Sequence, residues 1–255
     1  MIKENLQIIS NNLSLAWAET FLASLEPGVE EISPMSITVR DLIDDVPEMM
    51  EVRNALDQTL VNCGKFKTHT TANTIFPISL WNPEKNREDL FLRYHKILPG
   101  LKRADHHNRY GVYFERLVDY GIERQNQLDF IIKSYKGGNH RRSALQAAVY
   151  NPLSDQRNQP LRGFPCLQQV AFVPYPHLGQ LAIHGFYATQ YLFERAYGNL
   201  LGLARLGTFM AHEMGLQLSR ITCTASVAKY GNTTRRDLSL LAASIREILE
   251  RVSSN

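Results

Sequence analysis

The sequence lacks a long apolar run: none approaches the roughly 20 residues that a membrane-spanning helix needs. Its opening residues, MIKENLQIISNN, also lack the continuous apolar core and the small-residue cleavage site of a secretory signal peptide. These absences predict a protein without a membrane partner and with a cytoplasmic location.

Cysteine is scarce. The chain has 3, at the widely spaced positions Cys63, Cys166 and Cys223. An odd number at such spacings fits neither a disulfide framework nor a zinc site, and this agrees with a reducing compartment.

Motifs of several ligand-binding classes are missing or incomplete. There is no phosphate-cradling Walker loop and no G-x-G-x-x-G motif. His212-Glu213 begins like a zinc-protease motif, but Leu216 stands where the second histidine belongs. His106-His107 is an adjacent pair in a polar loop, a pattern that usually binds no metal.

Neither positive nor negative charge dominates the sequence. The net charge is +3 and the pI is 8.7, which is too weak a balance to predict nucleic-acid binding but is compatible with a local phosphate pocket. Apolar residues make up 44% and charged residues 21%, as in folded globular proteins. The chain contains no internal repeat, low-complexity tract or linker, so we predict a single domain over residues 1–255.

Apolar periodicity predicts helices interleaved with strands. Helices are expected over 12–26, 47–63, 86–98, 125–136, 194–215 and from 234 onward, and strands over 35–41, 144–150, 166–173, 180–187 and 221–228. The Thr-rich stretch 68–81 is also predicted to be β-rich. The short connection PYPHLG favours an antiparallel hairpin between 166–173 and 180–187. Together these elements predict an α+β fold.

The helix predicted over 194–215 is nearly all apolar. Gly198, Gly202 and Gly207 lie inside it, and each glycine costs about 1 kcal/mol relative to alanine in a helix. Three such residues indicate close packing on several sides, so we expect a buried central helix. Asn199 is a polar residue in this helix, and a bound ligand is a reasonable partner for its buried amide.

Four segments occur in a defined order along the chain. They are Tyr110-Gly111-Val112-Tyr113, Asn139-His140-Arg141-Arg142 before strand 144–150, Phe164-Pro165-Cys166 at the next strand, and Asn199. This order resembles that of the thymidylate synthase superfamily, closely over residues 110–232 and only in outline before them. The resemblance implies a thymidylate synthase-like fold, with a mixed sheet packed against helices, and a homodimer with shared active sites.

The resemblance also implies catalytic roles. Cys166 is the expected nucleophile, which attacks carbon six of a pyrimidine ring and thereby makes carbon five nucleophilic. Tyr113 belongs to the same expected catalytic set. Asp57 is the approximate counterpart of the family's catalytic glutamate if Gly64 marks the same helix end.

Five further residues are expected to bind the substrate, a pyrimidine nucleotide. Arg141 and Arg142 would reach across the dimer to the phosphate as planar bidentate donors. Asn199 would bind the edge of a uracil. Thr189 and Gln190 stand in the family's R-S-x-D segment, which is A-T-Q-Y here.

Methylenetetrahydrofolate is the cofactor that the resemblance implies, but several of the family's contacts are altered. The A-T-Q-Y segment lacks both the arginine for phosphate and the aspartate that holds the pterin. The family's sugar-binding His and Tyr fall at Lys229 and near Tyr230-Gly231. The chain also ends about one helix later, without the closing segment that keeps water from a reactive intermediate.

These patterns leave two main functions. The first is a transferase that modifies carbon five of a uracil (deoxy)nucleotide, by methylation or hydroxymethylation, through a Cys166 adduct. The alternative is a catalytically degenerate homodimer that binds or senses a pyrimidine nucleotide. A cysteine that starts a strand is more often a small buried apolar residue, but Pro165 and nearby arginines that would lower its pKa favour the nucleophile. An unrelated cysteine hydrolase would need a histidine base, and the sequence nominates none.

Overall fold

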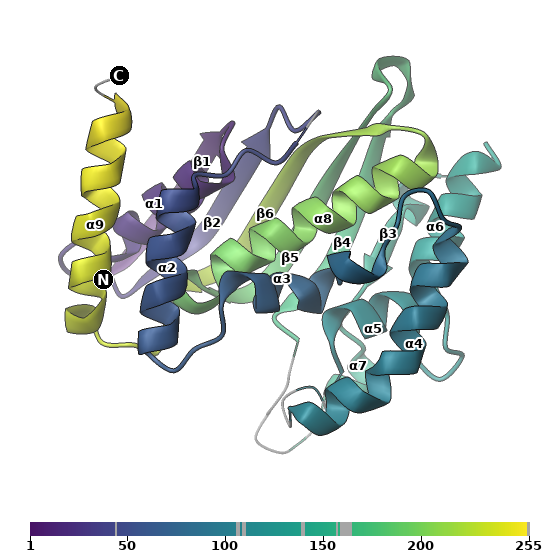
Figure 1. Cartoon of the computed structure of the whole chain (residues 1–255), viewed down its shortest axis with the longest axis horizontal. Coiled ribbons are helices and arrows are strands. Elements are labelled where there is room, and N and C mark those ends of the chain that lie inside the picture. Colours follow the sequence, from purple (N-terminus) through teal and green to yellow (C-terminus); the bar gives the residue numbers. More distant parts are fainter. Residues whose placement is uncertain are drawn as a thin grey trace.

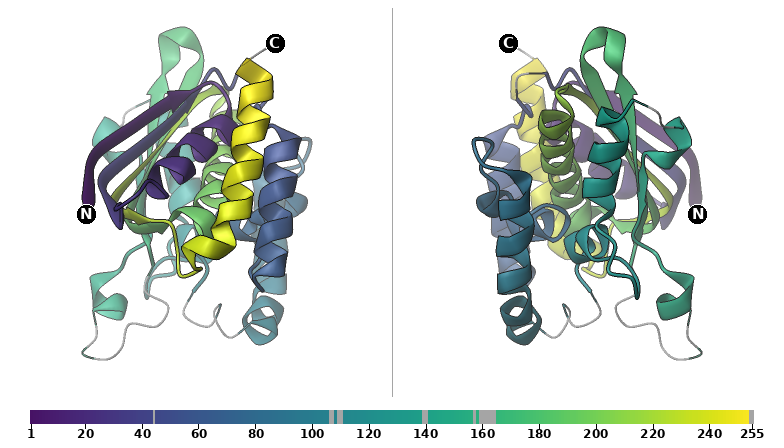
Figure 2. Two further views of the ribbon diagram at one scale, coloured as in Figure 1. Left: turned by 90° about the vertical axis from the view of Figure 1, so that its left-hand side faces the viewer. Right: turned by 90° about the vertical axis from the view of Figure 1, so that its right-hand side faces the viewer.

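The structure, a computed structural model, describes residues 1–43, 45–105, 108, 111–138, 141–156, 158 and 165–253. A mixed six-stranded sheet forms its centre, and the long helices α2, α8 and α9 lie on one side of it (Figures 1 and 2). The strands are β1 (Ile2–Ser10), β2 (Glu31–Arg40), β3 (Gln146–Ala148), β4 (Leu167–Tyr175), β5 (Gln180–Tyr191) and β6 (Gln217–Lys229). The α+β prediction is therefore confirmed.

The helices account for most of the remaining described chain. They are α1 (Leu13–Ser24), α2 (Met50–Asn62), α3 (Thr68–Ile75), α4 (Arg87–Ala104), α5 (Tyr113–Val118), α6 (Gln127–Lys136), α7 (Pro152–Asp155), α8 (Tyr197–Met214) and α9 (Arg235–Ser253). A π-helix, Leu192–Ala196, joins β5 directly to α8. The helices predicted over 12–26, 47–63, 125–136 and from 234 onward all form, and the one predicted over 86–98 runs on to Ala104.

The strands follow the order β1-β2-β6-β5-β4-β3. β1–β2 and β5–β6 pair in parallel, whereas β2–β6, β4–β5 and β3–β4 pair antiparallel. The antiparallel hairpin predicted across PYPHLG is β4–β5, with Tyr175 opposite Gln180. This topology brings the start of β4 and the end of β5 to the same end of the sheet.

The predicted central helix, α8, is buried along nearly its whole length. Its glycines face different neighbours. A Cβ on Gly198 would lie 2.5 Å from Cβ of Thr71, and one on Gly202 would lie 2.9 Å from the carbonyl oxygen of Ala72, so both glycines face α3. A Cβ on Gly207 would lie 2.7 Å from Leu218, on β6. The packing expected from the three glycines is therefore confirmed.

The β-rich stretch predicted over 68–81 is wrong. It begins with α3 and continues through a 3-10 turn, Ile78–Leu80. Threonine is typical of strands, but here Thr68, Thr71, Ala72 and Ile75 lie at helical spacing and are buried. Because Gly198 and Gly202 leave room for that face, the packing against α8 overrides the local preference.

β1 is not predicted from the sequence. It is an edge strand with mostly exposed residues, and among the described strands it pairs with β2 alone. Its apolar residues therefore do not alternate with the clear period of two that marks a half-buried strand.

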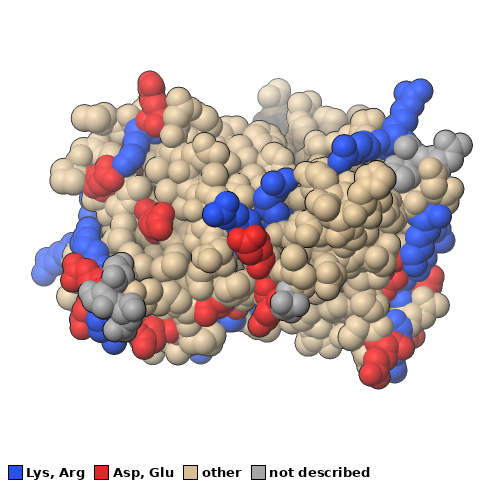
Figure 3. Space-filling view, turned by 90° about the horizontal axis from the view of Figure 1, so that it is seen from above, with Lys and Arg blue, Asp and Glu red and all other residues tan. Residues whose placement is uncertain are grey.

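Seen from above, Lys, Arg, Asp and Glu side chains form small scattered groups and gather toward the two ends, with broad uncharged areas between them (Figure 3). The described residues of this face therefore form no broad basic patch of the kind that nucleic-acid binding requires. Among the described residues, no helix combines the length and the apolar character needed to cross a membrane.

Candidate functional site

A cavity of about 370 Å³ lies where β4 begins, β5 ends and the helical run toward α8 starts. Five of the eight site residues predicted from the sequence line it: Tyr113, Cys166, Thr189, Gln190 and Asn199. They come from four separate parts of the chain, and the hairpin β4–β5 together with α8 brings them to one place.

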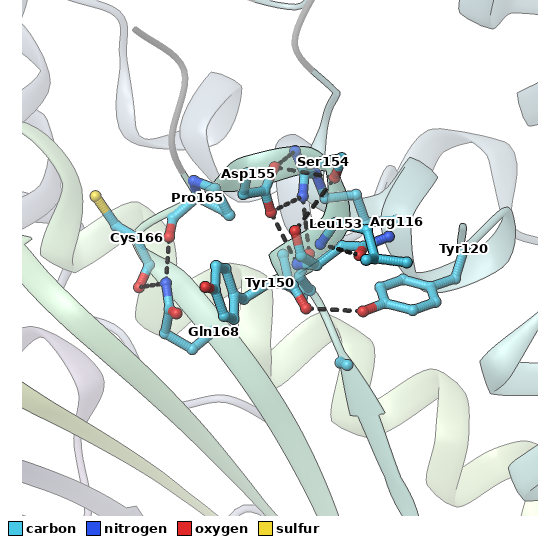
Figure 4. Close-up of polar contacts among 12 residues, drawn as sticks. Arg116, Tyr120, Tyr150, Leu153, Ser154, Asp155, Pro165, Cys166 and Gln168 are labelled. Atoms are coloured by element: carbon cyan, nitrogen blue, oxygen red, sulfur yellow. Dashed lines mark hydrogen bonds and ion pairs between the residues drawn. The ribbon is translucent and has the colours of Figure 1, made fainter. Parts of the chain in front are cut away.

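Cys166 directly precedes β4, and its backbone is held on two sides. Its carbonyl oxygen accepts a hydrogen bond from the backbone N–H of Ala188 at 2.9 Å and one from Nε2 of Gln168 at 3.4 Å. Gln168 also donates to the carbonyl oxygen of Pro165. Figure 4 shows the Sγ of Cys166 pointing away from the Gln168 side chain. The backbone is thus fixed while the thiol stays on the wall of the cavity.

The electrostatic environment of Cys166 differs from the sequence-based expectation. Burial raises the pKa of its thiol above the usual value, and the nearby Arg195 acts in the opposite direction without cancelling the rise. The expectation of a lowered pKa is therefore wrong in its net direction. The arginine beside the thiol is also neither Arg141 nor Arg142.

Two tyrosines lie close to Cys166. Burial raises the pKa of Tyr113 to about 12, and Cys166 adds to the rise, while backbone hydrogen bonds with Leu167 and Cys166 act against it. Burial also raises the pKa of Tyr187 well above its usual value, with contributions from Cys223, Tyr113 and Cys166. Both phenols are protonated at neutral pH, and Tyr113, which lines the cavity, can donate a hydrogen bond or a proton there.

Buried polar side chains line the cavity, and two of their atoms have no described hydrogen-bond partner. Gln190 is only 2% exposed; its Oε1 accepts from the Cys223 thiol at 3.4 Å, but its Nε2 has no hydrogen-bond partner within the described chain. The Oγ1 of Thr71, on α3, is equally buried and unpaired among the described residues. Asn199 is 4% exposed and lines the same cavity. Because buried polar groups are normally paired, the two atoms without a described partner point to a polar ligand.

Glu194 and Arg195 line the cavity as well, and they were not predicted as site residues. Both lie in the π-helix, and Arg195 stands four residues before Asn199. Side chains four residues apart share one face of a helix. That spacing was the available signal in the sequence, but the apolar character of the following helix obscured it.

Asp57 does not line the cavity. Its Oδ1 accepts a hydrogen bond from the backbone N–H of Thr68 at 2.7 Å, at the first residue of α3. A carboxylate there satisfies one of the unpaired N–H groups of a helix N-terminus. The position of Asp57 therefore does not support its predicted catalytic role. Its carboxylate stabilises the start of α3 instead.

Arg141 and Arg142 lie at the other end of the sheet. Nη2 of Arg142 donates to the carbonyl oxygen of Pro174 at 3.2 Å, and its guanidinium lies 5.8 Å from the centre of the Tyr175 ring. Tyr175 is the last residue of β4, whereas Cys166 precedes the first. At the rise of a strand, nine residues separate the two ends by roughly 30 Å. Within one chain, these arginines do not reach the cavity.

No histidine lines the cavity among the residues that the structure describes. Nε2 of His184, on β5, instead lies 2.9 Å from Oγ1 of Thr224, on β6. The described part of the chain also contains no group of three or more His, Cys, Asp or Glu side chains placed to hold a metal ion. His106-His107 lies outside the described residues, as do Tyr110, Asn139, His140 and Phe164.

No protein-family model matches the chain, and no curated protein matches it. The chemistry of the cavity is therefore the basis for inferring a function.

Proposed function

We propose that the protein is a thymidylate synthase-like transferase that modifies carbon five of a uracil nucleotide through a covalent Cys166 adduct. One observation carries this proposal: a partly buried thiol shares a cavity with the buried Asn199 and with two buried polar atoms that lack a described partner, Nε2 of Gln190 and Oγ1 of Thr71. A uracil ring carries two carbonyl oxygens and an N–H on its edge. Amide and hydroxyl groups can pair with all of these.

The proposed chemistry begins at the thiol. The Cys166 thiolate adds to carbon six, the C5–C6 electron pair moves to carbon five and its carbonyl, and carbon five becomes nucleophilic. Without a one-carbon donor, carbon five takes a proton from solvent. Loss of the original proton and expulsion of the thiolate then restore the ring. Tyr113, whose phenol stays protonated at neutral pH, is the described cavity residue best suited to supply or stabilise a proton during these steps.

A homodimer is part of the proposal. Arg141 and Arg142 lie about 30 Å from Cys166 along β4 of the same chain, so they can serve the cavity only from a second copy. Both residues are exposed, as such a role requires. The mixed sheet, the nucleophile at the start of β4 and the asparagine on a buried helix support a thymidylate synthase-like fold.

The cavity does not fit methylenetetrahydrofolate, the cofactor that the resemblance implies. A pterin needs a carboxylate partner, and Glu194 is the one carboxylate among the described lining residues. Its Oε1 is already engaged by Lys65 at 3.3 Å and by the backbone N–H of Asn232 at 3.1 Å. Tyr191 occupies the place of the pterin-binding aspartate. The proposed chemistry therefore includes no folate step.

The test is hydrogen exchange at carbon five. The protein is incubated in heavy water with dUMP, UMP, dCMP or CMP, without folate, and proton NMR follows the hydrogen on carbon five. We expect exchange on a uracil nucleotide that Cys166→Ala abolishes and Cys63→Ala, outside the cavity, leaves intact. Full exchange in the Cys166→Ala protein would overturn the proposal.

The alternative, a homodimer that binds a pyrimidine nucleotide without turnover, is favoured by the raised pKa of Cys166, because little thiolate is then present at neutral pH. Calorimetry separates the two functions. Nucleotide affinity that Cys166→Ala leaves unchanged, together with no exchange by the native protein, would establish the binding function. Exchange on any of the four nucleotides excludes it.

A further inference from the structure

Arg195 is an unpaired cation in the wall of the Cys166 cavity. Its guanidinium has no carboxylate partner and no hydrogen bond within the part of the chain that the structure describes. Arg195 is an exposed residue, whereas the less exposed Arg53, Arg87 and Arg116 form ion pairs with Glu48, Asp129 and Asp155. An arginine that faces a cavity and lacks such a partner is available to a ligand.

The backbone that carries Arg195 is held in place. Nε1 of Trp17 donates to the carbonyl oxygen of Leu192 at 2.8 Å. The backbone N–H of Phe193 donates to the carbonyl oxygen of Tyr230 at 2.9 Å. Leu192 and Phe193 both belong to the π-helix, so these two contacts anchor it to the rest of the fold. A π-helix often occurs at functional sites. The helical run continues from Arg195 to Asn199, so the two side chains stand one turn apart on the cavity face.

The groups around Arg195 do not neutralise its positive charge. Glu194 is the neighbouring carboxylate, but the Lys65 ammonium lies 3.3 Å from its Oε1. Tyr113 and Tyr187 have pKa values raised by burial, and both are neutral at physiological pH. The Cys166 thiol is also mostly neutral there, because burial raises its pKa. Among the described lining residues, Glu194 is thus ion-paired with Lys65, whereas the positive charge of Arg195 has no such partner.

We propose that Arg195 is an anion-binding residue that holds a negatively charged group of the ligand beside Cys166. The group is a phosphate or a carboxylate, since both accept the paired N–H donors of a guanidinium. This inference rests on the proposed function only in taking the Cys166 cavity as the ligand site. It gives the proposed nucleotide a phosphate contact from within its own chain.

The test compares two alkylating reagents that differ in charge. Iodoacetate is an anion and iodoacetamide is neutral; in both, the Cys166 thiolate forms an S–C bond as the C–I bond breaks and iodide leaves. Because the same thiolate attacks both reagents, the ratio of the two rates cancels any change in its pKa. Mass spectrometry of the Cys166 peptide separates this reaction from that of Cys63.

We expect the rate ratio of iodoacetate to iodoacetamide to fall about three- to tenfold in Arg195→Gln, because a cation that shares the cavity with the reacting thiol is lost. Arg195→Lys keeps most of the ratio. Arg246→Gln, which removes an exposed arginine of α9 far from the cavity lining, leaves it unchanged. In the native protein the ratio falls as salt is added, since ions screen the attraction.

A second measurement identifies the anion. Inorganic phosphate and acetate are each tested for protection of Cys166 against iodoacetamide. If phosphate or acetate protects Cys166 and Arg195→Gln removes this protection, the inference is supported. The ion that protects then identifies the preferred anionic group. Equal reagent ratios in the native and Arg195→Gln proteins would overturn it. A changed ratio with no hydrogen exchange at carbon five would instead count against the proposed reaction alone.

Discussion

The Cys223 thiol donates a hydrogen bond to Oε1 of Gln190, with 3.4 Å between the sulfur and the oxygen. Cys223 lies on β6 and Gln190 on β5, and both are buried. Because the thiol is a donor, it fixes Oε1 as the acceptor of the amide. The free Nε2 then remains as a donor at the base of the Cys166 cavity.

Stability should depend on pH through Cys223. Burial raises the pKa of its thiol from 9.0 to about 12, and the hydrogen bond to Gln190 acts in the opposite direction. Above about pH 9 the unfolded chain loses this proton while the folded protein keeps it, so the free energy of unfolding falls with rising pH, by about 1.4 kcal/mol per pH unit for this group. Urea unfolding at several pH values measures the slope. Cys223→Ala should show a shallower slope over that window, and parallel curves would contradict the assignment.

Asp57 should act in stability rather than in chemistry. Its Oδ1 accepts from the N–H of Thr68 at 2.7 Å. We expect Asp57→Ala to lower the free energy of unfolding by about 1 kcal/mol, and Asp57→Asn, which keeps an oxygen acceptor, to lower it by less. Alkylation of Cys166 and hydrogen exchange at carbon five should be close to native in Asp57→Asn. Loss of exchange in a stably folded Asp57→Asn protein would restore Asp57 to the catalytic set.

Gly202 should not tolerate a side chain. A Cβ there would lie 2.9 Å from both the carbonyl oxygen of Ala72 and Cβ of Ile75, so α3 must move away from α8. We expect Gly202→Ala to destabilise the protein by about 1–3 kcal/mol through overpacking. Gly100→Ala is the matched control, because Gly100 lies in α4 and a Cβ there would have no described neighbour within 4 Å. That change should instead stabilise by up to about 1 kcal/mol. Equal thermal shifts in the two variants would argue against close packing of α3 on α8.

The chain's 2 tryptophans offer a matched pair. Nε1 of Trp17 donates to the carbonyl oxygen of Leu192 at 2.8 Å, whereas the buried Nε1 of Trp81 has no partner among the described residues. Trp17→Phe removes this buried hydrogen bond and should lower the free energy of unfolding by about 1 kcal/mol beyond the loss of ring volume. Trp81→Phe removes an unsatisfied donor and should cost less. Chemical denaturation of both variants tests this order, and a larger loss in Trp81→Phe would contradict it.

Trp17→Phe should also affect the cavity. Because the hydrogen bond to Leu192 holds the π-helix that carries Arg195, its loss should bring the iodoacetate preference of Cys166 closer to that of Arg195→Gln. Trp81→Phe should leave the preference unchanged, since Trp81 is not among the residues that line this cavity.

Local patterns were sufficient for much of the fold. Three glycines in an apolar helix predicted a buried α8 with close neighbours, and PYPHLG predicted the β4–β5 hairpin. These signals depend on backbone and side-chain properties of a few adjacent residues. The stretch 68–81 was predicted incorrectly because its threonines favour strands locally, while its helical form depends on Gly198 and Gly202, more than a hundred residues away.

The sequence by itself determined the α+β class, the buried central helix and a set of five residues that meet in one cavity: Tyr113, Cys166, Thr189, Gln190 and Asn199. Tertiary structure alone decided three other points. It placed Asp57 at the start of α3, left Arg141 and Arg142 at the far end of the sheet from Cys166, and brought Arg195 to the thiol. The reason is physical: periodicity records which face of an element is buried, whereas the distance between two charged groups depends on how separate elements pack.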